Sequence, residues 1–119
     1  MIQVVNLEDK LSKISDYWHP RIVGELNESH VKLVKLQGEF VWHHHDHEDE
    51  LFLVLDGMLK MKLRDGDRLI HPGEFVIIPR GVEHCPVAEE AIKLMLLEPK
   101  TTLNTGTVQN ERTVEAEWI

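Results

Sequence analysis

The 119-residue chain carries 13 Lys and Arg against 21 Asp and Glu, which gives a formal net charge of −8 at pH 7, and 42% of its residues are apolar. This length is enough for one hydrophobic core and short for two, so we expect a single domain over residues 1–119. No basic cluster offsets the negative charge, and we therefore expect no binding to the phosphate backbone of a nucleic acid.

The sequence also contains nothing that predicts a membrane segment or a secretion signal. Its longest apolar runs, such as Leu51 to Leu55, are far shorter than the roughly 18 residues of a membrane-spanning helix. The first residues lack the basic start and apolar stretch of a signal peptide. The single cysteine, Cys85, cannot form an internal disulfide, which fits a reducing compartment. We therefore expect a cytoplasmic protein without a membrane partner.

Segment 6–18 is predicted to form a short N-terminal helix. Its apolar residues recur at spacings of four, three and four: Leu7, Leu11, Ile14 and Trp18. This spacing places them on one face of a helix, and Asn6 is suited to cap its N-terminus. The proline of His19-Pro20 disfavours helical backbone at the residue before it, so we expect the helix to end there.

From Arg21 to about residue 99 the sequence is typical of an all-β core. Its short apolar stretches are separated by turn-forming pairs: Asp56-Gly57, Asp65-Gly66 and Pro72-Gly73. Between Met58 and Arg64 apolar and basic residues alternate, which predicts a strand with one face in the core and the other in water. Residues 100–119 are polar and lack a strong period, so we expect them to form a C-terminal extension.

Four of the eight histidines lie within five residues, from His43 to His47. Alternate side chains of an extended strand share a face, so His43 and His45 point the same way, and His47 shares their parity. His44 is expected to face outward. Two imidazoles on one face at positions i and i+2 can meet a single metal ion.

Two further candidate ligands lie nearby in the predicted sheet. A loop over residues 46–49 followed by a returning strand would place Glu50 across a hairpin from His45, where opposed Cβ atoms are about 5 Å apart. His84 follows a predicted turn at Pro79-Arg80-Gly81, and closure of the sheet would bring it over the hairpin. The spacing thus favours a metal site.

These segments resemble the two motifs of the cupin family. The first spans Gly38, His43, His45, Glu50 and Gly57, and the second spans Gly73, Pro79, Gly81 and His84. The chain departs from the usual pattern in leaving four residues between Gly38 and His43 and in having Ala88 where the second motif ends in asparagine. Neither departure falls on a ligand of the family.

The resemblance implies a double-stranded β-helix, a jelly-roll-like cupin barrel, with a core at about residues 21–99. It also implies that His43, His45, Glu50 and His84 bind one divalent transition metal ion inside the barrel. Manganese, iron, nickel, copper and zinc all accept such a ligand set, so the sequence leaves the identity of the ion open. A six-coordinate ion would keep about two positions for water or a small-molecule ligand.

Two functions are open at this point. The first is a metal-dependent enzyme, of the dioxygenase, isomerase or lyase type, that acts on a small oxygen-bearing metabolite. In such an enzyme His47 is a candidate for proton transfer. The second is a non-catalytic cupin that binds a metabolite or metal as a sensor or store. Sheet edges and an apolar N-terminal segment favour a homodimer.

Overall fold

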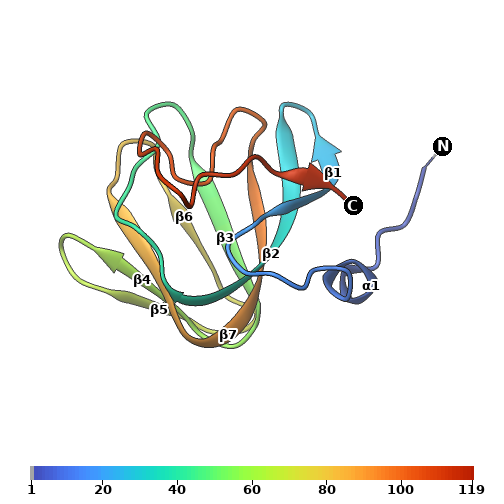
Figure 1. The fold of residues 1–119 in the computed structure, drawn as a ribbon, viewed down its shortest axis with the longest axis horizontal. Helices are drawn as coiled ribbons and strands as arrows, with labels where there is room; N and C mark the ends of the chain where they lie inside the picture. The colour runs from blue at the N-terminus through green and yellow to red at the C-terminus, as the bar shows by residue number, and fades with distance from the viewer. Residues whose placement is uncertain (1) are drawn as a thin grey trace.

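The structure is a computed structural model that describes residues 2–119. It is predominantly β, with a single short helix among the described residues (Figure 1). The elements in chain order are α1 (Leu7–Leu11), β1 (Arg21–Leu26), β2 (Ser29–Glu39), β3 (Glu50–Asp56), β4 (Leu59–Leu63), β5 (Arg68–Ile70), β6 (Phe75–Ile78), β7 (His84–Pro99) and β8 (Glu117–Trp118). The predicted all-β barrel with a short N-terminal helix is confirmed.

The long strand β7 organises the barrel. On one side it pairs antiparallel with β2 along most of its length. On its other side its first residues pair with β4 and its later residues pair with β3. The strand order is β5-β4-β7-β2-β1-β8, with β6 on the far side of β3. One strand thus joins both ends of the barrel, and both of its ends carry residues that face the interior.

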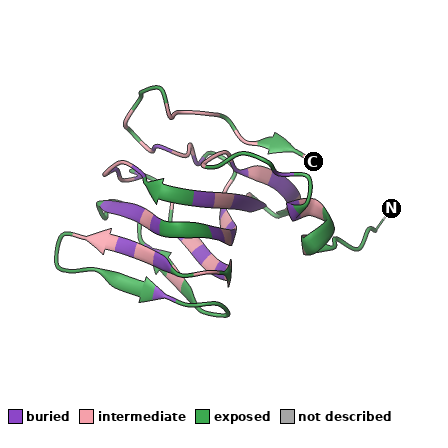
Figure 2. Cartoon of the chain, turned by 60° about the horizontal axis from the view of Figure 1, so that its bottom comes forward, coloured by how far each residue is buried: buried purple, intermediate pink, exposed green. Residues whose placement is uncertain are grey.

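The barrel interior is filled by the inward-facing residues of alternating strands. In β4, Leu59 and Met61 are fully buried while Lys60 between them is partly exposed, as the alternation predicts. Figure 2 shows the same change from buried to exposed positions along the strands. The inner cluster consists of Val34, Leu36, Phe52, Val54, Leu59, Met61, Ile70, Ile78, Ala88, Ile92, Leu94 and Leu96.

The N-terminal helix is shorter than the sequence predicts. It spans Leu7–Leu11, and the side chain of Asn6 caps it by accepting a hydrogen bond from the backbone N–H of Asp9 at 2.9 Å. Ser12 then donates its hydroxyl to the Asp9 carbonyl, which competes with continuation of the helix. Residues 13–18 form turns and bends, but Leu11 and Ile14 are still buried against Leu33 on the outer face of the sheet.

Residue Trp18 marks where the chain enters the barrel. Its backbone has a φ of +62°, an uncommon conformation for a large side chain. This conformation turns the indole onto Phe40, with 4.7 Å between ring centroids, and its Nε1–H donates to the Gln37 carbonyl. The contacts hold the indole against the mouth of the barrel interior.

The C-terminal segment, residues 100–119, crosses one end of the barrel (Figure 1). It returns to the sheet at β8, which pairs parallel with the start of β1. On the way, the N–H of Thr107 donates to the carbonyl of His44 at 3.3 Å. The segment therefore covers the end at which the candidate site lies. No helix within residues 2–119 is long and apolar enough to cross a bilayer.

Candidate metal centre

The two histidines of the first motif lie in a segment between β2 and β3, and its one ladder contact is at His43. His43 and His84 form an isolated antiparallel bridge, with N–H to carbonyl distances of 3.0 and 2.9 Å. Because alternate side chains of this extended segment share a face, His43 and His45 are both buried, whereas His44 is partly exposed. The predicted parity of these side chains is confirmed.

The prediction that a loop over residues 46–49 places Glu50 across a hairpin from His45 is wrong. Glu50 begins β3, which pairs with β6 and β7 and not with the segment that carries His45. Glu50 nevertheless reaches His45, because both side chains point into the barrel. The two side chains meet across the barrel interior and are not paired neighbours on adjacent strands. The spacing of these residues in the sequence does not predict such a contact.

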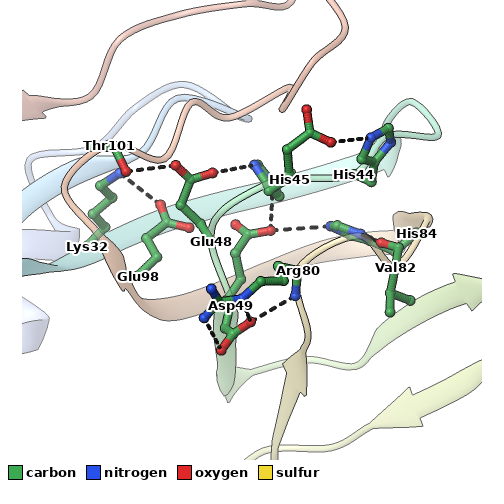
Figure 3. A network of polar contacts seen from close by, with 12 residues as sticks. Lys32, His44, His45, Glu48, Asp49, Arg80, Val82, His84, Glu98 and Thr101 are labelled. Carbon is green, nitrogen blue, oxygen red and sulfur yellow. Dashed lines mark hydrogen bonds and ion pairs between the residues drawn. The ribbon is translucent and has the colours of Figure 1, made fainter.

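The second motif forms the predicted turn. Gly81 has a φ of +81°, a conformation that favours glycine, and its N–H donates to the carbonyl of His45 at 2.8 Å. The N–H of Arg80 donates to the Asp49 carboxylate at 2.8 Å, and the Arg80 guanidinium pairs with the same carboxylate (Figure 3). These bonds join the loop before Glu50 to the turn before His84.

Four buried side chains meet at this point: His43, His45, Glu50 and His84. Each offers one ligand atom, and these atoms all lie within 4.8 Å of one another. Between 0 and 5% of each residue is exposed. This group, which we call the His/Glu cluster, can hold a metal ion, as the sequence predicts.

The orientation of two of the imidazoles is set by backbone carbonyls. The Nδ1 atom of His43 bonds to the carbonyl of Val41, and that of His84 bonds to the carbonyl of Val82, both at 2.9 Å. An N–H that donates to a carbonyl keeps the lone pair of a neutral imidazole on the other nitrogen. The Nε2 atoms of both rings are therefore left with lone pairs to offer a metal ion.

The innermost polar atoms of the cluster have no hydrogen-bond partner. His45 Nε2, His84 Nε2 and Glu50 Oε1 are all buried and unpaired. Glu50 Oε1 lies 2.7 Å from His45 Nε2 and 3.3 Å from His84 Nε2, but neither contact has hydrogen-bond geometry. With metal–ligand bonds of about 2.1 Å, ligand atoms at right angles around one ion are roughly 3 Å apart. The residues present thus fit a transition metal ion.

The charge states within the cluster also suit a cation. Burial, followed by the nearby His84, lowers the pKa of His43 to about 4, so its imidazole is neutral at pH 7. Burial by itself would raise the pKa of Glu50, but the neighbouring Glu98 carboxyl and the imidazoles outweigh it and hold this pKa well below its usual range. Neutral imidazoles and an ionised carboxylate are the states that bind metals.

The carboxylate of Glu48 lies near the imidazole of His45, on the side away from the other members of the cluster. Glu48 Oε1 is 4.0 Å from His45 Nδ1, and its other oxygen accepts a hydrogen bond from the Thr101 hydroxyl at 2.7 Å (Figure 3). Thr101 belongs to the C-terminal segment. The C-terminal segment, which covers this end of the barrel, thus also fixes the position of the Glu48 carboxylate beside His45 Nδ1.

The other histidines of the first motif lie outside the His/Glu cluster. His44 pairs with Asp46 at 2.9 Å, and its side chain is 35% exposed. His47 is exposed in the loop over residues 46–49 and is not a member of the cluster. Its predicted role in proton transfer stays a prediction. Cys85 is buried, and burial raises the pKa of its thiol, as suits an inert side chain.

Sequence reasoning missed a buried ion pair inside the barrel. Lys32 Nζ donates to Glu98 Oε1 at 2.8 Å, and each residue is 3% exposed. A signal was present: Glu98 continues the inward series of Leu94 and Leu96 on β7 and is therefore an acidic residue at a core position.

A small cavity of about 40 Å³ adjoins the His/Glu cluster. His43 and Glu50 form one part of its wall, and Glu98 forms another. Apolar side chains make up most of the remainder: Trp18, Pro20, Val34, Leu36, Phe40, Phe52, Pro86, Leu94 and Leu96, with Asn104 from the C-terminal segment. The cluster therefore faces space that a small ligand can occupy.

Three imidazoles and one carboxylate turned into the interior place this chain among the β-barrel proteins that have a candidate metal site inside the barrel. The chain belongs to one such family: the model of the Cupin_2 family, described as Cupin domain, matches residues 30–98. The match begins at the second residue of β2 and ends near the end of β7. It therefore includes all four members of the His/Glu cluster.

Two proteins with known structures are similar to most of this chain, and one of them carries the same family name. A cupin-2 domain containing protein from Shewanella frigidimarina NCIMB 400 is 46% identical, with a TM-score of 0.79 over 81% of this chain and 94% of its own. Protein NMB1881 from Neisseria meningitidis is 32% identical, with a TM-score of 0.75 over 82% of this chain and 99% of its own.

Two further matches are narrower. The uncharacterized protein YdbB of Bacillus subtilis (strain 168) is 36% identical over 63 residues, which are 52% of this chain and 56% of that protein. The chain thus spans about half the length of this curated relative. The sugar phosphate isomerase SPO2919 from Silicibacter pomeroyi DSS-3 has a TM-score of 0.56 at 23% identity, over 67% of this chain and 55% of its own. Its likeness shows the fold alone.

Proposed function

We propose that the protein is a metal-dependent enzyme that acts on a small oxygen-bearing molecule inside the barrel. The observation that carries the proposal is the set of buried, unpartnered ligand atoms of the His/Glu cluster beside a cavity. Burying polar atoms without partners is costly, and a bound cation would satisfy all of them at once. His43, His45, Glu50 and His84 are its proposed ligands.

A bound divalent ion would polarise an oxygen of a substrate as a Lewis acid. The chain itself supplies the positioning. His43 and His84 are held by backbone carbonyls, so their Nε2 atoms keep their direction without rearrangement. The apolar wall of the cavity, with Phe52 and Leu94, lowers the local dielectric and so strengthens electrostatic interactions inside.

The size of the cavity favours a ligand of a few heavy atoms. The cavity measures about 40 Å³; a single water needs roughly 10–15 Å³, whereas pockets for drug-sized ligands are about 300–1,000 Å³. No Lys or Arg is among the described residues that line the cavity. Both features argue against a sugar phosphate, the substrate class in the name of the SPO2919 structure, as the ligand of this cavity.

The test is metal analysis combined with a search for turnover. Protein purified without added metal is expected to contain about one equivalent of a transition metal, and the E50Q variant is expected to contain much less. The metal-loaded protein is then assayed against small diketones, thiols and hydroxy acids, with sugar phosphates as the larger class. Absence of bound metal in the unmodified protein would overturn the proposal.

A non-catalytic role is the second candidate, and the cover over the site is the observation that favours it. The C-terminal segment crosses this end of the barrel and contributes Asn104 to the cavity wall. If a small molecule raises the melting temperature of the metal-loaded protein and is recovered unchanged, the barrel is a binding module. Product formation would decide for the enzyme.

We also propose that the protein forms a homodimer. The support is exposed apolar surface outside the barrel, which monomeric proteins seldom carry in large patches. Ile2 and Val4 are nearly fully exposed in the N-terminal arm, and Leu69, Phe75 and Ile77 are more than half exposed on β5 and β6. Size-exclusion chromatography with light scattering is expected to give twice the chain mass of 13.8 kDa. A monomer at micromolar concentration would contradict this proposal.

A further inference from the structure

Apart from the His/Glu cluster, the barrel interior holds one other buried charged pair, Lys32 and Glu98, among residues 2–119. Lys32 lies on β2 and Glu98 on β7, and the two strands are neighbours in the sheet. Lys32 Nζ donates a hydrogen bond to one oxygen of the Glu98 carboxyl, Oε1, at 2.8 Å. The other oxygen, Oε2, is buried and has no hydrogen-bond partner.

Glu98 adjoins the same cavity as Glu50. Both residues line it, and the two carboxyls are close enough for a proton on Glu98 to be donated to Glu50, which lowers the pKa of Glu50 and helps to raise that of Glu98. Figure 3 shows the Glu98 side chain bound to Lys32, next to the network that contains Glu48 and His45. The second carboxyl oxygen of Glu98, which Lys32 does not bind, thus lies beside the proposed metal position.

The other polar groups of the cavity wall are already engaged. Asn104 donates its amide to the Arg112 carbonyl at 2.8 Å and accepts from the Val114 N–H at 3.0 Å. The indole N–H of Trp18 donates to the Gln37 carbonyl. Beside the His/Glu cluster, the described part of the cavity wall therefore offers one side-chain polar atom whose only polar neighbour is the Glu50 carboxyl, Glu98 Oε2.

We propose that Glu98 is a specificity-determining residue that hydrogen-bonds a hydroxyl group of a small ligand whose other oxygens bind the metal. The inference rests on the proposed metal-dependent function and names its ligand class, the small hydroxy acids. A hydroxyl both donates and accepts, so it can pair with this carboxyl in either protonation state. Leaving such a group unpaired in a buried site is costly, and ligands without the hydroxyl are therefore disfavoured.

The alternative is that Lys32 and Glu98 form only a structural pair, with a water molecule on Glu98 Oε2. A structural pair would contribute to stability but would not distinguish ligands by a hydroxyl. Two probes of nearly equal size separate these roles: glycolate and acetate share a carboxylate, and glycolate adds one hydroxyl. The cavity, at about 40 Å³, suits molecules of this size.

The experiment measures Kd for glycolate and for acetate on Co²⁺-loaded protein, from changes in the visible absorption of the ion. Replacing only Glu98 by an apolar residue would leave Lys32 buried and unpaired and could unfold the protein, so the test variant is K32M/E98M, which replaces both charges by apolar side chains. E98Q is a second variant that still offers Lys32 an acceptor. The control is K100M/E25M, which removes an ion pair of 3.2 Å whose side chains are 35 and 48% exposed.

The readout is the ratio of the two dissociation constants, acetate over glycolate. We expect this ratio to fall roughly tenfold or more in K32M/E98M, the size of a hydrogen bond to a charged group, to fall less in E98Q and to stay unchanged in the control. An equal ratio in K32M/E98M and the unmodified protein would overturn the inference, as would a glycolate complex in which Glu98 contacts no ligand atom.

Two further results separate this inference from the proposed function. If the unmodified protein fails to bind Co²⁺, both the proposed metal-dependent function and the inference about Glu98 are overturned. If K32M/E98M loses as much Co²⁺ affinity as E50Q does, Glu98 is a metal ligand, and the inference alone is overturned. Retention of the ion together with loss of the glycolate preference supports both.

Discussion

The carboxylate of Asp49 accepts a hydrogen bond from the backbone N–H of Arg80 at 2.8 Å and so joins two loops that are 31 residues apart in sequence. Asp49 precedes Glu50, and Arg80 lies in the turn that leads to His84. The contact therefore sets the distance between the carboxylate of the His/Glu cluster and one of its imidazoles. It lies outside the cluster and does not contribute a ligand itself.

Removal of this contact is expected to weaken metal binding. In D49A the turn before His84 loses its hydrogen bond to the loop of Glu50, and loss of such supporting contacts typically costs 10–100-fold in metal affinity. We expect a fall of about tenfold in Zn²⁺ affinity, measured by competition with a coloured chelator. D65A is the matched control, because Asp65 pairs with Arg68 at 3.4 Å on the surface. Equal affinities in D49A and D65A would contradict this role.

Chelation is expected to lower the stability of the protein. A ligand that binds only the folded state, at about 100 times its Kd, adds about 2.7 kcal/mol to the free energy of unfolding. Removal of the metal should therefore lower the melting temperature by several degrees, measured by calorimetry before and after dialysis against EDTA. In H84A the chelator should have no effect. The control H71A alters an exposed histidine and should retain the full response.

A methyl group at Gly106 is expected to lift the C-terminal segment from the site. A Cβ atom there would lie 2.0 Å from the carbonyl oxygen of His44, which is closer than any real contact, and φ is +60°. We expect G106A to lower the free energy of unfolding by about 2–4 kcal/mol in urea denaturation.

The chain offers a matched control for this variant at Gly73. Its φ is +84°, but nothing lies within 4 Å of the position of a Cβ atom. G73A therefore measures the conformational cost alone, about 1 kcal/mol. A loss in G106A no larger than that in G73A would show that the close approach to His44 is not needed.

The stability of the metal-free protein should depend on pH through His43. Its folded-state pKa is lowered to about 4 from 6.5, by burial first and by the nearby His84 second. Between pH 6.5 and pH 4 the unfolded state binds the proton and the folded state does not, so stability falls as pH falls. The His43 contribution is fully present above pH 6.5 and amounts to about 3 kcal/mol.

Urea denaturation with a chelator, at intervals from pH 7.5 to 4, measures this contribution. H43Q is the comparison, because its amide does not titrate while the other groups still do. The difference in unfolding free energy between the unmodified protein and H43Q is expected to shrink as the pH approaches 4. A constant difference over this range would show that His43 titrates in the folded state as it does in the unfolded state.

Much of the barrel could be predicted because its signals are local. The alternation of Leu59 and Met61 with Lys60 requires only that a strand be buried on one face, and the buried face is the predicted one. The same parity distinguishes the buried His43 and His45 from the partly exposed His44.

Two local predictions failed because tertiary contacts outweighed them. The apolar spacing from Leu7 to Trp18 predicts one helix, yet the backbone leaves the helix after Leu11 and the indole of Trp18 turns to stack on Phe40. The hairpin that would pair His45 with Glu50 is absent from the described sheet, because β3 pairs with β6 and β7 instead. Neither the apolar spacing from Leu7 to Trp18 nor the spacing from His45 to Glu50 predicts where these distant partners lie.

By itself, the sequence determined the family, the all-β class and the four residues of the His/Glu cluster, since these depend on residue types at short, regular spacings. Only the tertiary structure decided that Glu50 reaches His45 across the barrel, that residues 100–119 cover the site and that Glu98 lies beside it. Those relationships join residues up to about 60 positions apart, and chain closure sets them through backbone pairing and packing, which no local pattern records.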